Sequence, residues 1–141
     1  MIDKTDKMII KLLEINARTS YTNIADKLKL SEGTIRHRVS KMEENGIIEG
    51  YEIKLNPQKM GLTCPAIIGV DVEPDKFLET ASIISNINEI KNVFTCTGDH
   101  MILFEIWLEN QKELSKFLKQ KIENIEGLKR ICPAIILNKL K

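Results

Sequence analysis

The chain has 141 residues, of which 43% are hydrophobic and 29% are charged, and its formal net charge is +1. This composition is ordinary for a globular protein, and the near-neutral charge balance does not by itself indicate a nucleic-acid partner. No apolar run approaches the ~18 residues of a membrane span, and Asp3 and Asp6 interrupt the N-terminal segment where a signal peptide would be apolar. The sequence therefore predicts a cytoplasmic protein with no membrane partner.

Catalytic and metal-binding chemistry have no recognisable motif in this sequence. The cysteines, Cys64, Cys96 and Cys132, are odd in number and form no CxxC pair, which argues against a disulfide framework or a zinc site. No nucleophile–base pair, paired carboxylates or glycine-rich phosphate loop falls in a known pattern. We therefore expect no catalytic residue, no metal and no cofactor, and we do not expect an enzyme.

The first 45 residues predict three helices. Residues 6–15 have the apolar spacing of the first helix. Ser20 is placed to cap a second, short helix, and Ser31 is placed to cap a third. The third helix is expected to end just before Gly46, which can adopt the left-handed conformation common after helices. Three helices with a tight turn between the second and the third predict a helix-turn-helix domain.

The third predicted helix has two contrasting faces. Ile35, Val39 and Met42 recur at the spacing of one helical face, whereas most other positions carry polar donors. Such helices lie in the major groove of DNA, where Arg pairs with guanine and Ser or Thr with several base edges. A solvated face with a Glu32–Arg36 pair is the alternative, but the helix-turn-helix order favours DNA. The predicted DNA-binding residues are Tyr21, Thr22, Ser31, Glu32, Gly33, Thr34, Arg36, His37, Arg38, Ser40 and Lys41.

After Gly46 the sequence changes to strand-like periodicity. Residues 47–55 alternate apolar and polar side chains, and residues 64–141 follow the order strand-helix-strand twice. This order predicts an α+β fold in which the second domain is a ferredoxin-like βαββαβ unit, with both helices on one face of an antiparallel sheet. The predicted organisation is a (winged) helix-turn-helix domain at 1–54, a hinge at 55–63 and the ferredoxin-like domain at 64–141.

The predicted sheet is rich in apolar residues. We expect both of its faces to be substantially apolar, on the strength of six residues and their neighbours: Ile67, Val93, Ile102, Phe104, Ile106 and Ile135. Because the helices cover only one face, a partner is expected to cover the other. The sequence therefore predicts a homodimer.

Residues 2–61 resemble the DNA-binding half of the Lrp/AsnC family, the feast/famine regulators. The matching features are Asp3 and Asp6, the NAR turn, IADKLKLS, the R-x-R-V of the third helix, and NGIIEGY followed by NP. The second half resembles the effector-binding and assembly domain of the family, including TGDH between two strands. The resemblance implies a transcriptional regulator that binds roughly palindromic operators as a homodimer, often assembled into tetramers or octamers. It also implies that residues 48–55 pair as a strand across the dimer.

The resemblance further implies that an amino acid is sensed near residues 97–101. The family pattern there is Gly, any residue, an aromatic and Asp, whereas this chain has Gly98, Asp99, His100 and Met101. Met101 is a poor acceptor for the ammonium group of an amino acid, and the side chain of Asp99 would point the other way on a strand. These four residues form a candidate effector site, and a hairpin turn that binds no ligand is the open alternative.

One other function remains as an alternative, and RNA binding is set aside. A small-molecule sensor that regulates an enzyme by protein contact would use the second domain but would leave the basic helix unexplained. RNA binding through the open sheet face would need stacking aromatics, a signature that the first and third strands lack. The transcription machinery is a further candidate partner, and the sequence does not distinguish activation from repression.

Overall fold

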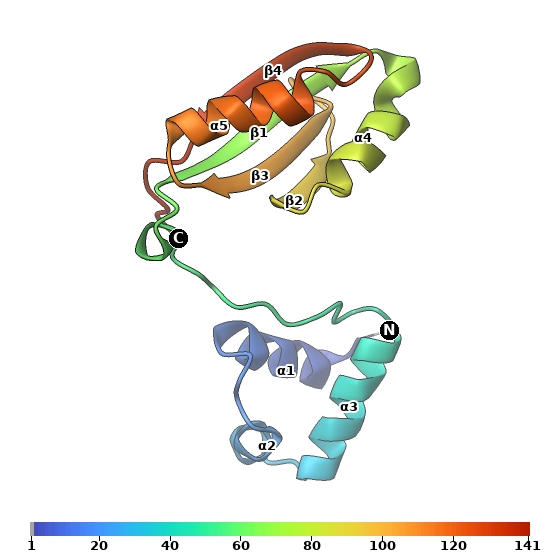
Figure 1. The fold of residues 1–141 in the computed structure, drawn as a ribbon. Helices are drawn as coiled ribbons and strands as arrows, with labels where there is room; N and C mark the ends of the chain where they lie inside the picture. Colours follow the sequence, from blue (N-terminus) through green and yellow to red (C-terminus); the bar gives the residue numbers. More distant parts are fainter. Residues whose placement is uncertain (1) are drawn as a thin grey trace. The chain divides into compact units, whose positions relative to one another are not determined.

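A computed structural model describes residues 2–141, which divide into two compact units, one ending at Lys54 and the other starting at Leu55. The helices of the first unit are α1 (Lys4–Ile15), α2 (Tyr21–Leu28) and α3 (Glu32–Glu44), shown in blue to cyan in Figure 1. Within residues 2–141, no helix is long and apolar enough to span a membrane.

Helix α1 begins two residues earlier than the sequence predicts. Asp3 is its N-cap: the Asp3 carboxylate accepts a hydrogen bond from the Asp6 backbone N–H at 2.9 Å. The Asp6 carboxylate in turn accepts one from the Asp3 N–H, also at 2.9 Å. This reciprocal capping box satisfies two of the backbone N–H groups that lack partners at a helix start, so the helix includes Lys4 and Thr5.

The serine caps and the glycine end of α3 are confirmed. The hydroxyls of Ser20 and Ser31 accept backbone hydrogen bonds at 3.2 and 3.1 Å from the third residue after each. Gly46 has φ +66°, and the Ile47 N–H donates to the carbonyl of Met42 at 2.8 Å. This is the Schellman arrangement, which ends α3 abruptly.

The turn between α2 and α3 contains a non-glycine residue in the left-handed region. Lys29 has φ +54°, and the following Leu30 N–H donates to the Ala25 carbonyl at 3.0 Å. The left-handed conformation costs a side-chain-bearing residue roughly 1–2 kcal/mol. The buried residues of the three helices offset that cost by packing into one core, made of Ile9, Leu13, Ile24, Ala25, Ile35, Val39 and Met42.

The segment that follows α3 forms no strand within the described chain. The sequence predicts a strand at residues 47–55, yet residues 49–56 have no regular secondary structure. A strand needs a neighbouring strand to satisfy its backbone hydrogen bonds, and none of the described residues pairs with this segment. The alternating pattern is therefore not realised as a strand in a single chain.

The second unit is the predicted α+β fold. Its strands are β1 (Cys64–Val72), β2 (Ile90–Thr95), β3 (Ile102–Leu108) and β4 (Leu128–Ile135). All pairings are antiparallel, in the order β2-β3-β1-β4. Its helices are α4 (Phe77–Ser85) and α5 (Gln111–Phe117), with a π-helical turn at Leu118–Ile122 and 3-10 turns at Gln58–Met60 and Pro74–Lys76. Both α4 and α5 cover the same face of the sheet (Figure 1).

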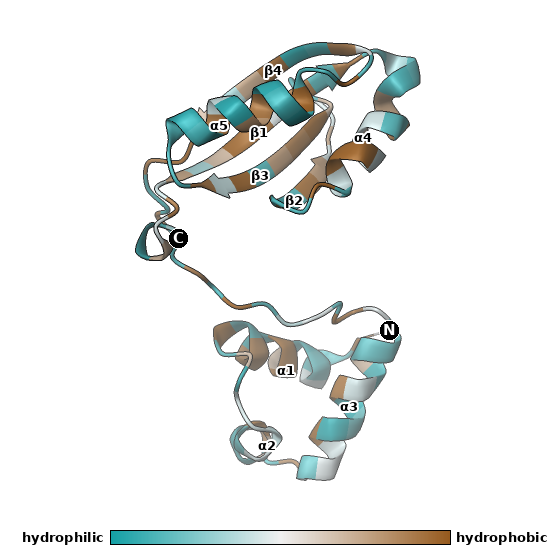
Figure 2. Ribbon diagram, viewed as in Figure 1, coloured by the Kyte–Doolittle hydropathy of each residue, from teal (hydrophilic) through white to brown (hydrophobic). Residues whose placement is uncertain are grey.

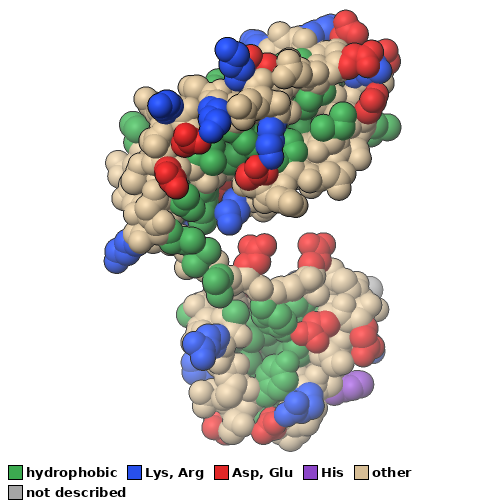
Figure 3. Space-filling view, viewed as in Figure 1, with side chains coloured by type: hydrophobic (Ala, Val, Ile, Leu, Met, Phe, Trp, Pro, Cys, Tyr) green, Lys and Arg blue, Asp and Glu red, His purple; other side chains and the backbone are tan. Residues whose placement is uncertain are grey.

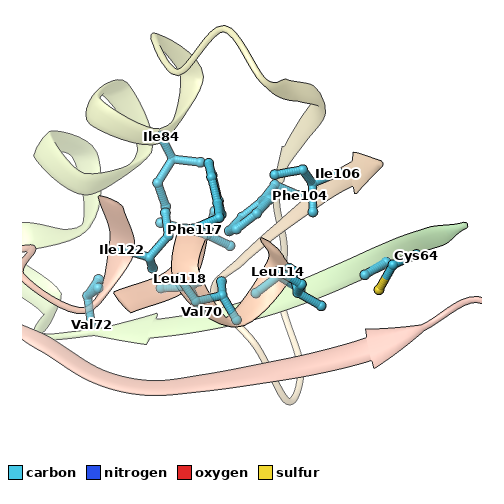
Figure 4. Close-up of a cluster of buried hydrophobic side chains, with 13 residues drawn as sticks. Cys64, Val70, Val72, Ile84, Phe104, Ile106, Leu114, Phe117, Leu118 and Ile122 are labelled. Atoms are coloured by element: carbon cyan, nitrogen blue, oxygen red, sulfur yellow. The ribbon is translucent and has the colours of Figure 1, made fainter. Parts of the chain in front are cut away.

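The core of this unit lies between the sheet and its helices. Phe104 of β3 packs against Phe117 of α5 with ring centroids 6.5 Å apart and the rings edge to face (Figure 4). Figure 2 shows α5 with hydrophilic residues along its outer side and hydrophobic residues toward the sheet. The helices thus bury one sheet face and leave the other open.

The apolar residues are distributed between the two sheet faces differently from the prediction. Five of the six residues expected to make both faces apolar belong to or pack against the buried core: Val93, Ile102, Phe104, Ile106 and Ile135. Only Ile67 lies on the open face, where it is 42% exposed. The open face is nonetheless apolar in part, because Phe94 and Leu103 pair with each other on that face and Phe94 is 56% exposed. The six residues were assigned to the wrong faces because an apolar strand residue does not reveal from its type which way it points.

Candidate DNA-binding surface and effector loop

Helix α3 presents most of the predicted DNA-binding residues to solvent. Ile35 and Val39 are fully buried against α1 and α2, which turns Gly33 and His37 outward. The exposed members of the predicted set are Thr22, Ser31, Glu32, Gly33, Arg36, His37, Ser40 and Lys41, and the partly buried ones are Tyr21, Thr34 and Arg38. The structure therefore brings the set together on the first turn of α2 and the first three turns of α3.

Arg38 is committed to ion pairs inside the domain. Its Nη1 lies 2.7 Å from Asp3 Oδ2 and 2.8 Å from Asp6 Oδ1. The Asp6 backbone N–H, followed by Arg38, holds the pKa of Asp3 below its ordinary value, and the two carboxylates raise the pKa of Arg38. The sequence places Arg38 in the predicted DNA-binding set, whereas in the structure its side chain joins α3 to the capping box of α1.

Arg36 is held at the junction of α2 and α3. Its Nη2 donates to Glu32 Oε1 at 2.6 Å, and its guanidinium carbon lies 5.3 Å from the centroid of the Tyr21 ring. The Thr22 hydroxyl donates to the other Glu32 oxygen at 3.0 Å. Arg36, followed by Thr22, lowers the pKa of Glu32. Arg36 nevertheless remains 64% exposed, so it can reach a ligand from this position.

Gly33 leaves part of the exposed helix surface bare. A Cβ at Gly33 would meet no atom within 4 Å, so packing inside the domain does not require glycine there. Glycine costs about 1 kcal/mol relative to alanine in a helix. Nearby, an open groove of about 1120 Å³ is lined in part by Gly33, His37 and Lys41. The bare backbone beside a groove is suited to close approach by another molecule.

Charges of both signs occur on the face drawn in Figure 3. Basic and acidic side chains are mixed there on each of the two units. This agrees with the formal net charge of +1. Attraction for DNA in this chain therefore depends on local groups on α2 and α3 more than on a whole-molecule field.

The loop between β2 and β3 is a closed hairpin. The Cys96 N–H donates to the Met101 carbonyl at 2.9 Å, and Gly98 has φ +112°, a conformation that favours glycine. Gly98, Asp99, His100 and Met101 thus form one tight turn. The turn brings the predicted effector residues together.

Asp71 of β1 anchors this loop. Its Oδ1 accepts a hydrogen bond from the Met101 N–H at 3.1 Å, and its Oδ2 lies 3.0 Å from both His100 Nδ1 and Arg130 Nε. Arg130 also donates to the Asp99 carbonyl at 3.1 Å. Burial raises the pKa of Asp71, but the hydrogen bonds from His100, Arg130 and Met101 together outweigh it and lower that pKa. The loop is thereby tied to two strands by charged side chains.

Sequence reasoning missed Asp71 and Arg130. Their separation along the chain hides their pairing, but Asp71 gives one available signal, because it is an acid within the otherwise apolar strand CPAIIGVDV. A partly buried carboxylate in a strand needs partners, which predicts polar groups beside it. The carboxylate of Asp71 is also a strong hydrogen-bond acceptor for an ammonium group, whereas the thioether of Met101 is a weak one. A ligand ammonium group at this loop would compete for it with His100 and Arg130.

A helix-turn-helix unit followed by an α+β unit with a charged loop defines a class of DNA-binding regulators that carry a separate ligand-binding domain. Residues 2–49 match the family model described as winged helix-turn-helix DNA-binding. Residues 65–141 match the model described as the Lrp/AsnC ligand binding domain. The chain belongs to the Lrp/AsnC family of transcriptional regulators.

Individual relatives agree with this assignment. The HTH-type transcriptional regulator LrpA of the archaeon Pyrococcus horikoshii is 44% identical over 141 residues, which cover 100% of both chains. The structure of Escherichia coli AsnC superposes with a TM-score of 0.88 at 27% identity and covers 100% of this chain and 95% of that one. A transcriptional regulator of Neisseria meningitidis, in complex with L-Met, has a TM-score of 0.90 at 23% identity and covers 100% of this chain and 93% of its own. The last similarity shows the fold alone.

Proposed function

We propose that this regulator reads palindromic operators by placing α3 and its flanking caps, residues 31–45, in the major groove. The observation that carries the proposal is the exposed polar face of α3 opposite the buried Ile35, Val39 and Met42. Arg36 and His37 supply donors that reach base edges from the N-terminal half of the helix, the part that contacts bases in helix-turn-helix proteins. Arg38 contributes indirectly, by holding α3 against α1.

A homodimer is the proposed binding unit. On the open sheet face, Phe94 is 56% exposed and Ile67 is 42% exposed. In the first unit, Ile53 lies within the unpaired segment 49–56 and is 79% exposed. Apolar groups and unpaired backbone of this kind favour a second copy as the partner. Two copies would present two α3 helices to two half-sites, and tetramers or octamers would arise by further association of dimers.

The second unit is the proposed sensor of an amino acid or a related small molecule. Its match to the Lrp/AsnC ligand binding domain supports this role, as does the L-Met complex of the Neisseria regulator. The proposed contacts are Gly98, Asp99, His100 and Met101, together with Asp71 beside them. Thermal unfolding in the presence of each amino acid in turn tests this, because a ligand that binds the folded state raises the unfolding temperature. No shift with any amino acid would favour a hairpin that binds no ligand.

Selection of bound duplexes from a random DNA pool tests the DNA-binding proposal. We expect enrichment of a palindrome whose half-sites lie about one helical turn, 10–10.5 base pairs, apart. Folded protein that enriches no sequence, at a stated salt concentration near physiological, would contradict it. The position of the enriched operators relative to promoters would then indicate whether the protein blocks or contacts the transcription machinery.

The relatives are named transcriptional regulators, and we propose no catalytic activity for this chain. Because chromosomal DNA in archaeal cells lies in the cytoplasm, we also propose a cytoplasmic location.

A further inference from the structure

The carboxylate of Glu32 is shared between two helices. Its Oε1 accepts a hydrogen bond from Arg36 Nη2 at 2.6 Å, and its Oε2 accepts one from Thr22 Oγ1 at 3.0 Å. Each oxygen of Glu32 therefore already has a protein partner. Arg36 makes a further contact with α2, because its guanidinium carbon lies over the Tyr21 ring, 5.3 Å from the ring centroid. Four side chains thus join the first turns of α2 and α3.

This network holds Arg36 on two sides while leaving it accessible. Glu32 holds one nitrogen, Tyr21 lies under one face, and the side chain is still 64% exposed. Among residues 2–141, no hydrogen bond engages its Nε or Nη1. A guanidinium that is already positioned loses less conformational freedom when its remaining donors are used.

We propose that Glu32 is a positioning residue that sets the DNA specificity of this regulator. This rests on the proposed role of α3 as the reading helix. Non-specific binding arises mainly from neutralised phosphates, so an arginine whose charge is already balanced by Glu32 contributes little to it. At an operator, the free donors of Arg36 reach a base edge while Nη2 stays on Glu32. Glu32 therefore raises the ratio of operator affinity to non-specific affinity.

The test compares affinities for an operator duplex selected from a random pool and for a scrambled duplex of the same length, each over a range of salt concentrations. We expect Glu32→Gln to bind the scrambled duplex several-fold more tightly. Its slope of log affinity against log salt should steepen by about 0.9, the effect of one more phosphate neutralised. Operator affinity should stay constant or fall, so the specificity ratio drops.

Glu14→Gln is the matched control. Glu14 is an exposed residue of α1 that makes no ion pair within residues 2–141, and its replacement changes the net charge by the same amount. If the two substitutions raise the affinity for scrambled DNA equally, the change in net charge alone explains the effect of Glu32→Gln. That outcome would overturn the proposal. Circular dichroism melting of both variants establishes that the helices remain folded.

A double substitution separates positioning from direct contact. If Glu32 acts through Arg36, then Glu32→Gln should leave the specificity ratio unchanged in the Arg36→Ala background. A full effect of Glu32→Gln in that background would show that Glu32 acts on DNA directly, which would overturn the positioning role. A wild-type protein that prefers no duplex would instead refute the proposed function of α3, a failure distinct from either of these.

Discussion

The imidazole ring of His100 lies against the backbone of Gly69, so closely that a Cβ on Gly69 would be 2.5 Å from His100 Cδ2. Gly69 is in the middle of β1, opposite Leu103 on one side and Cys132 on the other. Glycine is otherwise unfavourable in a strand interior, and here it makes room for the ring. The position of the loop at residues 97–101 thus depends on the absence of a side chain at Gly69 of β1.

Gly69→Ala should displace His100 and weaken the second unit. The ring has to move to accommodate the methyl group, which breaks its hydrogen bond to Asp71. Overpacking of this kind typically costs about 1–3 kcal/mol of unfolding free energy, measurable by urea denaturation. In the His100→Ala background the same methyl group should cost much less. Equal costs in the two backgrounds would contradict the packing relationship.

Acid should weaken the attachment of the loop. The pKa of Asp71 is lowered in the folded protein because its hydrogen bonds outweigh the opposing effect of burial. A lowered folded-state pKa contributes stability that is fully present above the unfolded-state value, near 4, and is lost as the pH falls through the folded-state value. The unfolding free energy of the wild type should therefore fall more steeply below about pH 4 than that of Asp71→Asn. Asp75→Asn, at an exposed site, is the control and should retain the wild-type slope.

Arg38 and Arg36 should differ in their effects on folding. Arg38→Ala removes hydrogen bonds to Asp3 and Asp6, of which the Asp6 side chain is only 13% exposed. We expect a loss of about 1–2 kcal/mol, after allowance for the solvent exposure of Asp3. Arg36→Ala should change unfolding by less than about 0.5 kcal/mol, since its pairing with Glu32 is a surface i,i+4 contact. Urea titrations that give equal losses for the two variants would contradict this assignment.

Gly33→Ala should separate stability from DNA binding. The added methyl group meets nothing in the free protein and removes the helical cost of glycine, so unfolding free energy should rise by up to about 1 kcal/mol. Operator affinity should nevertheless fall, because the methyl group occupies the bare surface of α3. A variant that is both more stable and an equally good binder would show that Gly33 lies outside the DNA contact.

Local signals account for what the sequence predicted correctly. Ser20 and Ser31 cap α2 and α3 through residues three positions away, and Gly46 ends α3 by its own backbone preference. Such features can be read within a few residues. The strand-helix order of the second unit likewise follows from changes in hydrophobic period.

The features that escaped prediction depend on residues far apart in the chain. Arg38 meets Asp6 across 32 positions, and Arg130 meets Asp71 across 59. The open sheet face is also ambiguous from sequence, because apolar residues such as Val93 and Ile135 satisfy an apolar pattern whichever way they point. The DNA-binding set stays a prediction, and the division of its members into free and internally paired side chains required the fold.

The contact between Asp3 and Arg38 ties the N-terminal segment to the middle of α3. Any peptide fused ahead of residue 2, such as a purification handle, would therefore emerge beside the proposed DNA-binding surface. A basic handle there would add phosphate contacts of its own, and a bulky one would obstruct the groove. Binding constants measured on such a fusion would report partly on the handle, so its cleavage or relocation is advisable before affinities are compared.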